Sequence, residues 1–269
     1  MNKVSIPDRT LKEEIAKSFG RSVPYYEEEA KLQKDIADRL IASLEPWKAI
    51  IPPGPILEIG CGTGFVTKGL IDLYPNRAKE ITDISSSMVE FCKTKFKGAA
   101  NTDFYTLDAE SIDPESSDYS LTVSGFAAQW FNDPALTLGR ILEATKPGGL
   151  MLVSFPGSES FPEWKEKCRD LGIPFTGNQL PDTEEVAIKL SVGPAQIDFY
   201  EDTVTQKFSG AADFFRHLKL IGAGTKQNDR SLSPKELKML IRHWNESTEG
   251  EISVNYHVVF MAVKRDHTA

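Results

Sequence analysis

The sequence predicts an α/β protein with a mostly parallel sheet and helices on both of its faces. Short apolar runs alternate with helical patterns from about residue 56 to residue 155. The first of these runs ends in closely spaced glycines, as a buried strand does when it turns sharply into a helix. The chain has 269 residues, a length that suits one large domain or a domain with a substantial insert.

The alternating region predicts its elements one after another. We expect five strands, at 56–59, 78–83, 102–107, 119–124 and 150–155. Helices are expected at 65–74, from Ser86 onward and at 135–145. The turn Pro147-Gly148-Gly149 separates the last of these helices from the fifth strand.

The flanking segments follow other patterns. Residues 11–44 show helical spacing, and Pro24 is expected to divide them into two helices. After Phe155 the alternation stops, and helices are expected at 161–171, 182–190, 211–220 and 234–245. The apolar run 252–263 predicts a closing strand. We therefore expect a helical cap at 1–50, a ligand-binding core at 51–156, an acceptor-binding insert or lid at 157–250 and the closing strand at 251–269.

Composition excludes several classes of protein. Hydrophobic residues make up 40% and charged residues 26%, which indicates a globular chain. The net charge of −8 argues against nucleic acid or an anionic membrane as a partner. No apolar run is long enough for a transmembrane helix, and the N-terminus has no signal-peptide pattern. The 3 Cys are too few and too scattered for a disulfide framework or a zinc site, so we expect a cytoplasmic protein with no metal.

The most specific motif is Glu58-Ile59-Gly60-Cys61-Gly62-Thr63-Gly64. Alternate glycines allow a ligand to lie directly against the main chain where a strand turns into a helix. The spacing G-x-G-x-G differs from the dinucleotide fingerprint G-x-G-x-x-G. A carboxylate at Glu58 would repel a pyrophosphate but suit a cation or an ammonium group. An ordinary tight turn remains the alternative.

Acidic residues also follow the next two expected strands. Asp83 ends the second strand, where a carboxylate can accept hydrogen bonds from both hydroxyls of a ribose. Asp108 and Glu110 follow the third strand, where an acid can accept from an adenine amine. Each of these acids can equally cap a helix, but their positions at consecutive strand ends beside one glycine loop favour a nucleotide-type site.

This set of residues resembles the class I S-adenosylmethionine-dependent methyltransferases. The resemblance rests on the glycine loop, on Asp83-Ile84-Ser85 with Met88, on Asp108-Ala109-Glu110 and on Lys146-Pro147-Gly148-Gly149. It implies a Rossmann-like class I methyltransferase fold with a seven-stranded sheet, N-terminal helices and an inserted lid, and S-adenosyl-L-methionine as the cofactor. A nicotinamide enzyme is the alternative. The implied cofactor-binding residues are Glu58, Gly60, Cys61, Gly62, Gly64, Asp83, Ile84, Met88, Asp108, Ala109, Glu110 and Gly125.

Four further segments resemble the malonyl-[acyl-carrier protein] O-methyltransferase family of biotin synthesis. They are Phe19-Gly20-Arg21 with Tyr26 and Gln33, then 124–130, 218–223 and 255–259. Members of the family often have Asn where Gly125 stands. The resemblance implies methylation of the free carboxylate of a malonyl group carried by an acyl carrier protein. A methyltransferase for another small carboxylic acid or metabolite, and a non-catalytic S-adenosylmethionine-binding protein, are the alternatives.

Methyl transfer to an ionised carboxylate needs no general base, and the sequence offers no Ser/His/Asp or metal-ligand grouping. No certain catalytic residue is therefore assigned. The candidates for acceptor binding each have an alternative role in packing or as a solvated charge. They are Arg21, Tyr26, Gln129, Trp130, His217 and Lys219.

Charge is distributed unevenly along the chain. Residues 203–242 contain eight Lys or Arg and three acids, a local charge of +5. Because acyl carrier proteins are acidic, as the resemblance implies, this segment is a candidate docking surface. Its proposed members are Arg216, Lys219, Lys226, Arg230 and Arg242.

Overall fold

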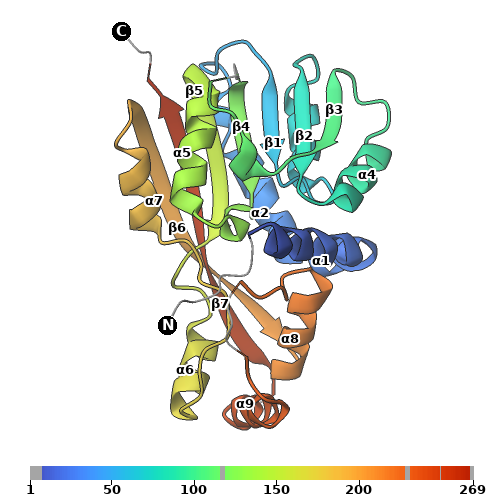
Figure 1. The fold of residues 1–269 in the computed structure, drawn as a ribbon, viewed down its shortest axis with the longest axis vertical. Helices are drawn as coiled ribbons and strands as arrows, with labels where there is room; N and C mark the ends of the chain where they lie inside the picture. Colours follow the sequence, from blue (N-terminus) through green and yellow to red (C-terminus); the bar gives the residue numbers. More distant parts are fainter. Residues whose placement is uncertain (1–7, 116–118, 228–230, 249, 267–269) are drawn as a thin grey trace.

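The computed structural model describes residues 8–115, 119–227, 231–248 and 250–266. Its centre is a seven-stranded sheet of order β3-β2-β1-β4-β5-β7-β6 (Figure 1). The strands are β1 Ile56–Ile59, β2 Lys79–Asp83, β3 Thr102–Thr106, β4 Tyr119–Gly125, β5 Thr145–Pro156, β6 Ala195–Phe208 and β7 Ile252–Arg265. Strands β1 to β5 pair in parallel, and β7 is antiparallel to both β5 and β6. The predicted mostly parallel, seven-stranded fold is confirmed.

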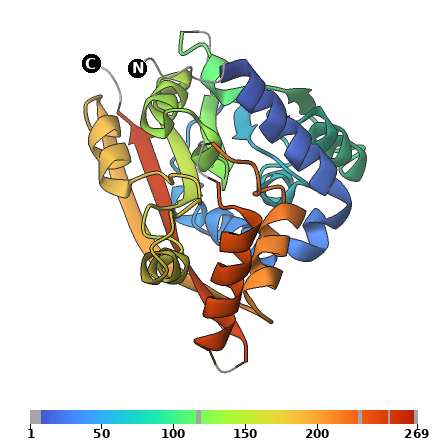
Figure 2. The same cartoon turned by 60° about the horizontal axis from the view of Figure 1, so that its bottom comes forward.

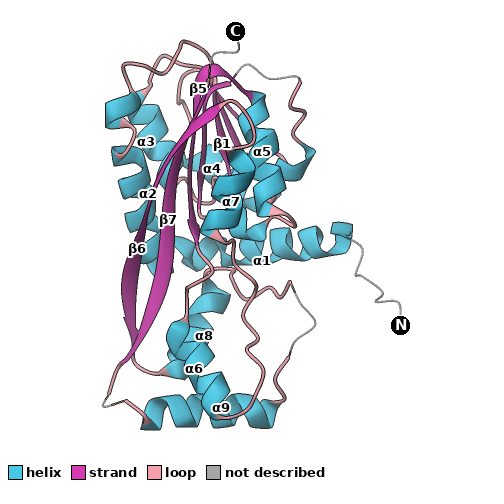
Figure 3. Cartoon of the chain, turned by 90° about the vertical axis from the view of Figure 1, so that its left-hand side faces the viewer, coloured by secondary structure: helices cyan, strands magenta, loops and turns pink. Residues whose placement is uncertain are grey.

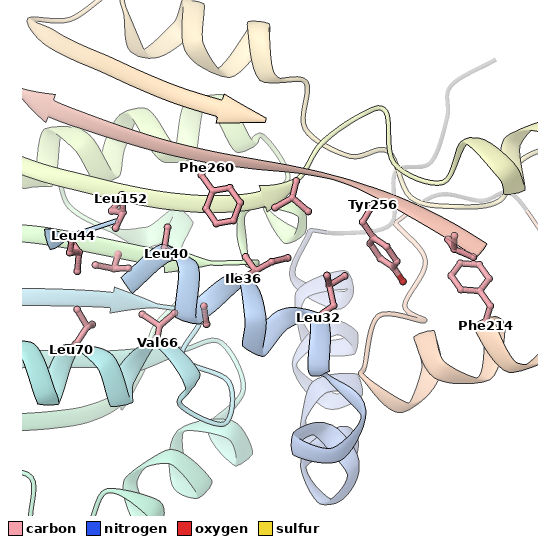
Figure 4. Close-up of a cluster of buried hydrophobic side chains, with 14 of the residues drawn as sticks. Leu32, Ile36, Leu40, Leu44, Val66, Leu70, Leu152, Phe214, Tyr256 and Phe260 are labelled. Carbon is pink, nitrogen blue, oxygen red and sulfur yellow. The ribbon is translucent and has the colours of Figure 1, made fainter. Parts of the chain in front are cut away.

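Helices cover both faces of the sheet, and alternate residues along the strands explain why. On β5, Leu150 and Leu152 join one buried cluster with α2 and α3, whereas Met151 and Val153 join another with α5 and α7. The helices are α1 Asp8–Glu29, α2 Lys31–Ala42, α3 Phe65–Leu73, α4 Ser86–Lys95, α5 Pro134–Ala144, α6 Pro162–Asp170, α7 Thr183–Leu190, α8 Ala211–Leu220 and α9 Pro234–Glu246. Short 3₁₀ helices lie at Glu45–Trp47, Ala109–Ser111 and Ala128–Trp130. Figure 4 shows the first cluster between α2, α3 and the strands.

The end of the sheet where β1, β2 and β4 finish faces a second layer of helices. There α1 runs across the strand ends, and α6, α8 and α9 lie beyond it (Figures 1 and 2). The parallel strands therefore end in a space bounded by α1 and the outer helices, which is where open α/β sheets bind ligands.

In the described part of the chain, no helix is long and apolar enough to cross a membrane.

The expected division of the N-terminal helices was wrong. The chain does not break at Pro24, because α1 continues through this residue to Glu29 and the helical path is interrupted at Ala30, where ψ is 47°. Helix α1 packs closely on α4: a Cβ at Gly20 would lie 3.1 Å from the Ser87 hydroxyl. Tertiary packing of this kind outweighs the hydrogen bond lost at a proline inside a helix.

The strand β6 was not expected. It lies within 157–250, the segment assigned to the lid, and pairs antiparallel with β7 along its whole length (Figure 3). It is an edge strand with most of its residues exposed, so its sequence contains no apolar run. The fifth strand also begins earlier than expected, and the predicted turn at Pro147–Gly149 is an irregularity inside β5.

Candidate active site

The glycine loop after β1 uses its glycines in two different ways. Gly60, Gly62 and Gly64 all have positive φ, at 75°, 52° and 89°. A Cβ at Gly60 would lie 2.5 Å from a neighbouring side-chain carbon, and one at Gly64 would lie 2.4 Å from the ring of Phe96. A Cβ at Gly62 would meet nothing closer than Tyr26, at 4.0 Å. Gly60 and Gly64 are thus required by packing, whereas Gly62 leaves its backbone open to a cavity.

Asp83 fixes the loop from the end of β2. One carboxylate oxygen accepts the Gly62 N–H at 2.9 Å, and the other accepts the Ser85 N–H at 2.8 Å. Burial raises the pKa of Asp83, although the two backbone donors act in the opposite direction. A carboxylate oxygen can accept more than one hydrogen bond. Asp83 therefore shapes the loop and keeps acceptor capacity toward the cavity that it lines.

The acids after β3 are joined to α1 by a lysine that sequence reasoning missed. The Lys12 ammonium lies 2.6 Å from an Asp108 carboxylate oxygen and 2.9 Å from one of Glu110. Asp108 also accepts the Glu110 N–H at 3.0 Å, and Glu110 accepts the Asn132 N–H at 2.8 Å. Burial lowers the pKa of Lys12, but its bonds to the two acids raise it overall. The ion pair therefore fastens α1 over this part of the site.

These groups surround a cavity of about 80 Å³ at the strand ends. The α1 residues Lys12, Ile15, Phe19 and Tyr26 close one side of it. Burial and the charge of Asp83 raise the pKa of Tyr26, whose ring stacks on Phe65. The remaining lining residues come from the strand ends and the loops after them: Ile59, Gly60, Gly62, Asp83, Ile84, Leu107, Asp108, Ala109, Glu110, Gly125, Phe126, Ala127, Trp130 and Phe131.

A second cavity of about 330 Å³ adjoins the first, and the two share Phe126 and Trp130 as lining residues. The Trp130 ring is held edge-on against Phe19 at 5.2 Å. The walls of this cavity are mainly apolar and aromatic, and its charged lining residues in the described part of the chain are Lys219 and Lys226. It is of the size that encloses small ligands.

Three residues that line the larger cavity each have a buried polar atom with no hydrogen-bond partner among the described residues. These atoms are the side-chain carbonyl oxygens of Gln33 and Gln129 and the hydroxyl of Tyr256. Leaving one such atom unsatisfied costs about 1–3 kcal/mol. Because these atoms lie in the walls of one cavity, this cavity is the candidate site for a polar acceptor.

The structure brings most of the sequence-predicted residues to the two cavities. Gly60, Gly62, Asp83, Ile84, Asp108, Ala109, Glu110 and Gly125 line the smaller one, as does Tyr26. Gln129, Trp130 and Lys219 line the larger one. A Cβ at Gly125 would lie 2.9 Å from Val66, so the Asn common in the resembled family requires Val66 to shift.

Other predicted cofactor residues lie behind the smaller cavity and do not line it. Glu58 is 1% exposed and accepts a hydrogen bond from the Thr67 hydroxyl at 2.7 Å. Burial raises its pKa well above the usual range, which removes the reason to expect an ionised carboxylate there. Cys61 is buried in a small cluster with Ile81, and Met88 is a buried residue of α4. With Gly64, these residues support the loop from behind.

Two predicted acceptor residues lie outside both cavities. Arg21 is exposed on α1. His217 is buried, with its Nδ1 3.3 Å from a carboxylate oxygen of Glu29, and joins α8 to the end of α1. Sequence reasoning assigned no role to Trp164, and it quoted Gln33 and Tyr256 only as parts of resembling segments. No local signal identifies these three, because the fold brings them together from α2, α6 and β7.

The fold and the site together define a class I methyltransferase. Residues 56–149 match the methyltransferase domain family, so the class that the sequence resemblance implied is confirmed. The YcgJ protein from Bacillus subtilis has the same fold, with a TM-score of 0.61 at 14% identity over 86% of this chain and 100% of that one.

Two curated relatives are similar over nearly the whole chain. The malonyl-[acyl-carrier protein] O-methyltransferase of Magnetococcus marinus is 29% identical over 91% of this chain and 90% of its own. The enzyme of the same name from Bacillus cytotoxicus is 27% identical over 94% and 91%, respectively. The resemblance to this group, first drawn from four short segments, is confirmed.

Proposed function

We propose that the protein transfers a methyl group from S-adenosyl-L-methionine to the free carboxylate of malonyl-[acyl-carrier protein], as an early step of biotin synthesis. The observation that carries this proposal is the pair of adjoining cavities that share Phe126 and Trp130. One has the acids and the open glycine of a nucleoside site, and the other has buried polar atoms that lack partners. The names of the full-length relatives support the choice of acceptor.

The residues around the smaller cavity fit the cofactor. Gly62 carries no side chain that would fill the space before the loop. Asp83 offers carboxylate oxygens to ribose hydroxyls, and Asp108 and Ala109 lie where the adenine would be read. When bound, the cofactor supplies an electrophilic methyl group on a sulfonium.

The chain's own contribution is alignment and exclusion of water. A carboxylic acid with an ordinary pKa near ~4 is already ionised at neutral pH, so no residue needs to remove a proton. Phe126 and Trp130 form an apolar boundary between the cavities. A dry, fixed geometry of this kind can supply about 7–11 kcal/mol of the barrier reduction.

Helix α1 must move for the cofactor to enter. The cavity of about 80 Å³ is smaller than typical ligand pockets, which begin near ~300 Å³. Its closed side is α1, fastened by Lys12 to Asp108 and Glu110. We infer that Lys12 releases these acids and α1 swings outward before the cofactor binds.

We place the docking surface for the carrier protein on α8 and α9, which contact each other (Figure 2). The exposed basic residues of these two helices are Arg216, Lys219, Lys235, Lys238 and Arg242. Two of these charges are partly neutralised within their helices, Arg216 by Asp213 and Arg242 by Glu246. Lys226 lines the larger cavity, and Arg230 lies outside the described residues. Lys235 and Lys238 therefore offer the clearest attraction for an acidic partner.

Reversing Lys235 and Lys238 to Glu tests this surface. Neither residue lines the larger cavity, so an effect on KM reports docking and not acyl binding. We expect KM for malonyl-[acyl-carrier protein] to rise about 10-fold at low salt through slower association, and the difference to shrink as salt is raised. Steady-state kinetics at several ionic strengths measure both effects.

The control makes the same charge change elsewhere. Lys93 and Lys97 are exposed on and just after α4, which lies across α1 from α8 (Figure 1). Their reversal to Glu should leave KM nearly unchanged. An equal rise of KM in both double variants would indicate a general charge effect and would contradict the proposed docking surface.

A comparison of acceptors tests the function itself. Malonyl-[acyl-carrier protein], malonyl-CoA and free dicarboxylic acids are offered with the cofactor at equal concentration. We expect the carrier thioester to be methylated with the highest kcat/KM. Equal rates on free acids would favour a small-acid methyltransferase, and cofactor binding without turnover would favour a non-catalytic protein.

The three cysteines are buried and form no disulfide bond, which suits a reducing compartment, and we propose the cytoplasm.

A further inference from the structure

Tyr256 of β7 lines the larger cavity and carries a buried hydroxyl. The side chain is 3% exposed, and its hydroxyl has no hydrogen-bond partner among the described residues. In Figure 4 its ring extends from β7 into the space between Leu32 of α2 and Phe214 of α8. The hydroxyl is thus a buried polar group on a residue that lines the cavity, and no described residue satisfies it.

The surroundings hold this hydroxyl in place as a donor. The ring packs edge-on against Phe161 at 4.9 Å. Burial raises the pKa of Tyr256, so the hydroxyl is protonated at neutral pH. A fixed, protonated hydroxyl in an apolar wall is suited to an acceptor that carries negative charge.

The other polar groups of the cavity point to the same ligand chemistry. Gln33 also lines the cavity, and its amide contains both an NH₂ donor and a carbonyl oxygen without a partner among the described residues. The described lining residues include Lys219 and Lys226 but no Asp or Glu. A carboxylate offers acceptors only, so it suits the O–H donor of Tyr256 and the two lysines, and no acid of the described lining opposes it.

We propose that the Tyr256 hydroxyl donates a hydrogen bond to the acceptor's carboxylate and selects acyl thioesters that carry one. This assignment rests on the function proposed above and adds the residue that recognises the reacting group. The bond fixes one carboxylate oxygen and leaves the other free to face the cofactor cavity across Phe126 and Trp130.

The test is Tyr256→Phe, which removes one oxygen and keeps the ring. Two constants are measured: KM for malonyl-[acyl-carrier protein], and Ki for acetyl-[acyl-carrier protein] as a competitive inhibitor that has the thioester but no carboxylate. We expect KM to rise between about 10- and 100-fold, as for loss of a bond to a charged group. We expect kcat to stay close to that of the unaltered protein, and Ki to be unchanged. A parallel rise in both constants would assign the hydroxyl to the thioester carbonyl and overturn the proposal, as would no change in KM.

A matched control and a stability measurement separate this role from a structural one. The hydroxyl of Tyr74 is also buried and without a partner among the described residues, but it lies outside both cavities, so Tyr74→Phe should leave KM unchanged. Removal of an unsatisfied hydroxyl should not lower the thermal midpoint of either variant. A KM increase matched by a lower midpoint in Tyr256→Phe would overturn the assignment. If the unaltered protein does not methylate malonyl thioesters at all, the proposed function fails instead, and the two failures are distinguishable.

Discussion

Replacement of Asp83 with alanine is expected to weaken cofactor binding about 100-fold or more. The carboxylate accepts the N–H groups of Gly62 and Ser85, so the variant loses both the loop's support and the proposed ribose acceptor. A 100-fold loss corresponds to about 2.7 kcal/mol, which is within the range of one or two hydrogen bonds to a charged group. Isothermal titration with S-adenosylhomocysteine measures the change directly.

The control for Asp83 is another aspartate of the same sheet. Asp103 is exposed on β3 and lies outside both cavities, so Asp103→Ala should bind the cofactor normally. Circular dichroism establishes that both variants fold. Normal cofactor affinity in a folded Asp83→Ala variant would remove this residue from the site.

Replacement of Trp130 with alanine is expected to lower kcat/KM about 100-fold, with a smaller effect on cofactor affinity. Trp130 lines both cavities, and its ring is fixed by Phe19. Without the indole ring the cavities merge and water reaches the reacting groups. The variant then loses several of the ~7–11 kcal/mol by which fixed alignment can lower the reaction barrier. Single-turnover rates with saturating cofactor isolate the methyl-transfer step.

Trp47→Ala provides the comparison. Trp47 is also half-buried, but it packs against the hydrophobic cluster beside α2, outside both cavities. This variant should lose stability and retain its kcat. If both tryptophan variants lose activity in proportion to their loss of stability, Trp130 has only a packing role.

The core of the fold was predictable because its signals are local. The strands β1, β2 and β4 are short, mostly buried runs that end beside a glycine or an acid, and helical patterns alternate with the strands along the chain. By contrast, β6 pairs with β7 at the edge of the sheet and exposes most of its residues. Its sequence therefore contains too little apolar character to predict a strand. Pro24 was misjudged for a similar reason, because contacts with α4 hold α1 together.

The same difference between local sequence signals and tertiary contacts decides which site residues could be predicted. Gly62, Asp83 and Asp108 lie at strand ends that follow one another in the sequence, so their proximity follows from the predicted sheet. Lys12 meets Asp108 only because α1 crosses the strand ends, and Tyr256 meets the cavity only because β7 returns from the far end of the chain. The buried position of Glu58 also depends on packing that the motif does not encode.

The identity of the product tests the central claim most directly. The protein is incubated with methyl-labelled S-adenosylmethionine and malonyl-[acyl-carrier protein], and the carrier is analysed by mass spectrometry before and after mild alkaline hydrolysis. We predict one labelled methyl group per malonyl thioester, absent from acetyl-[acyl-carrier protein], and released as methanol by ester hydrolysis. Label on the carrier polypeptide, or label equally on the acetyl form, would contradict methylation of the free carboxylate.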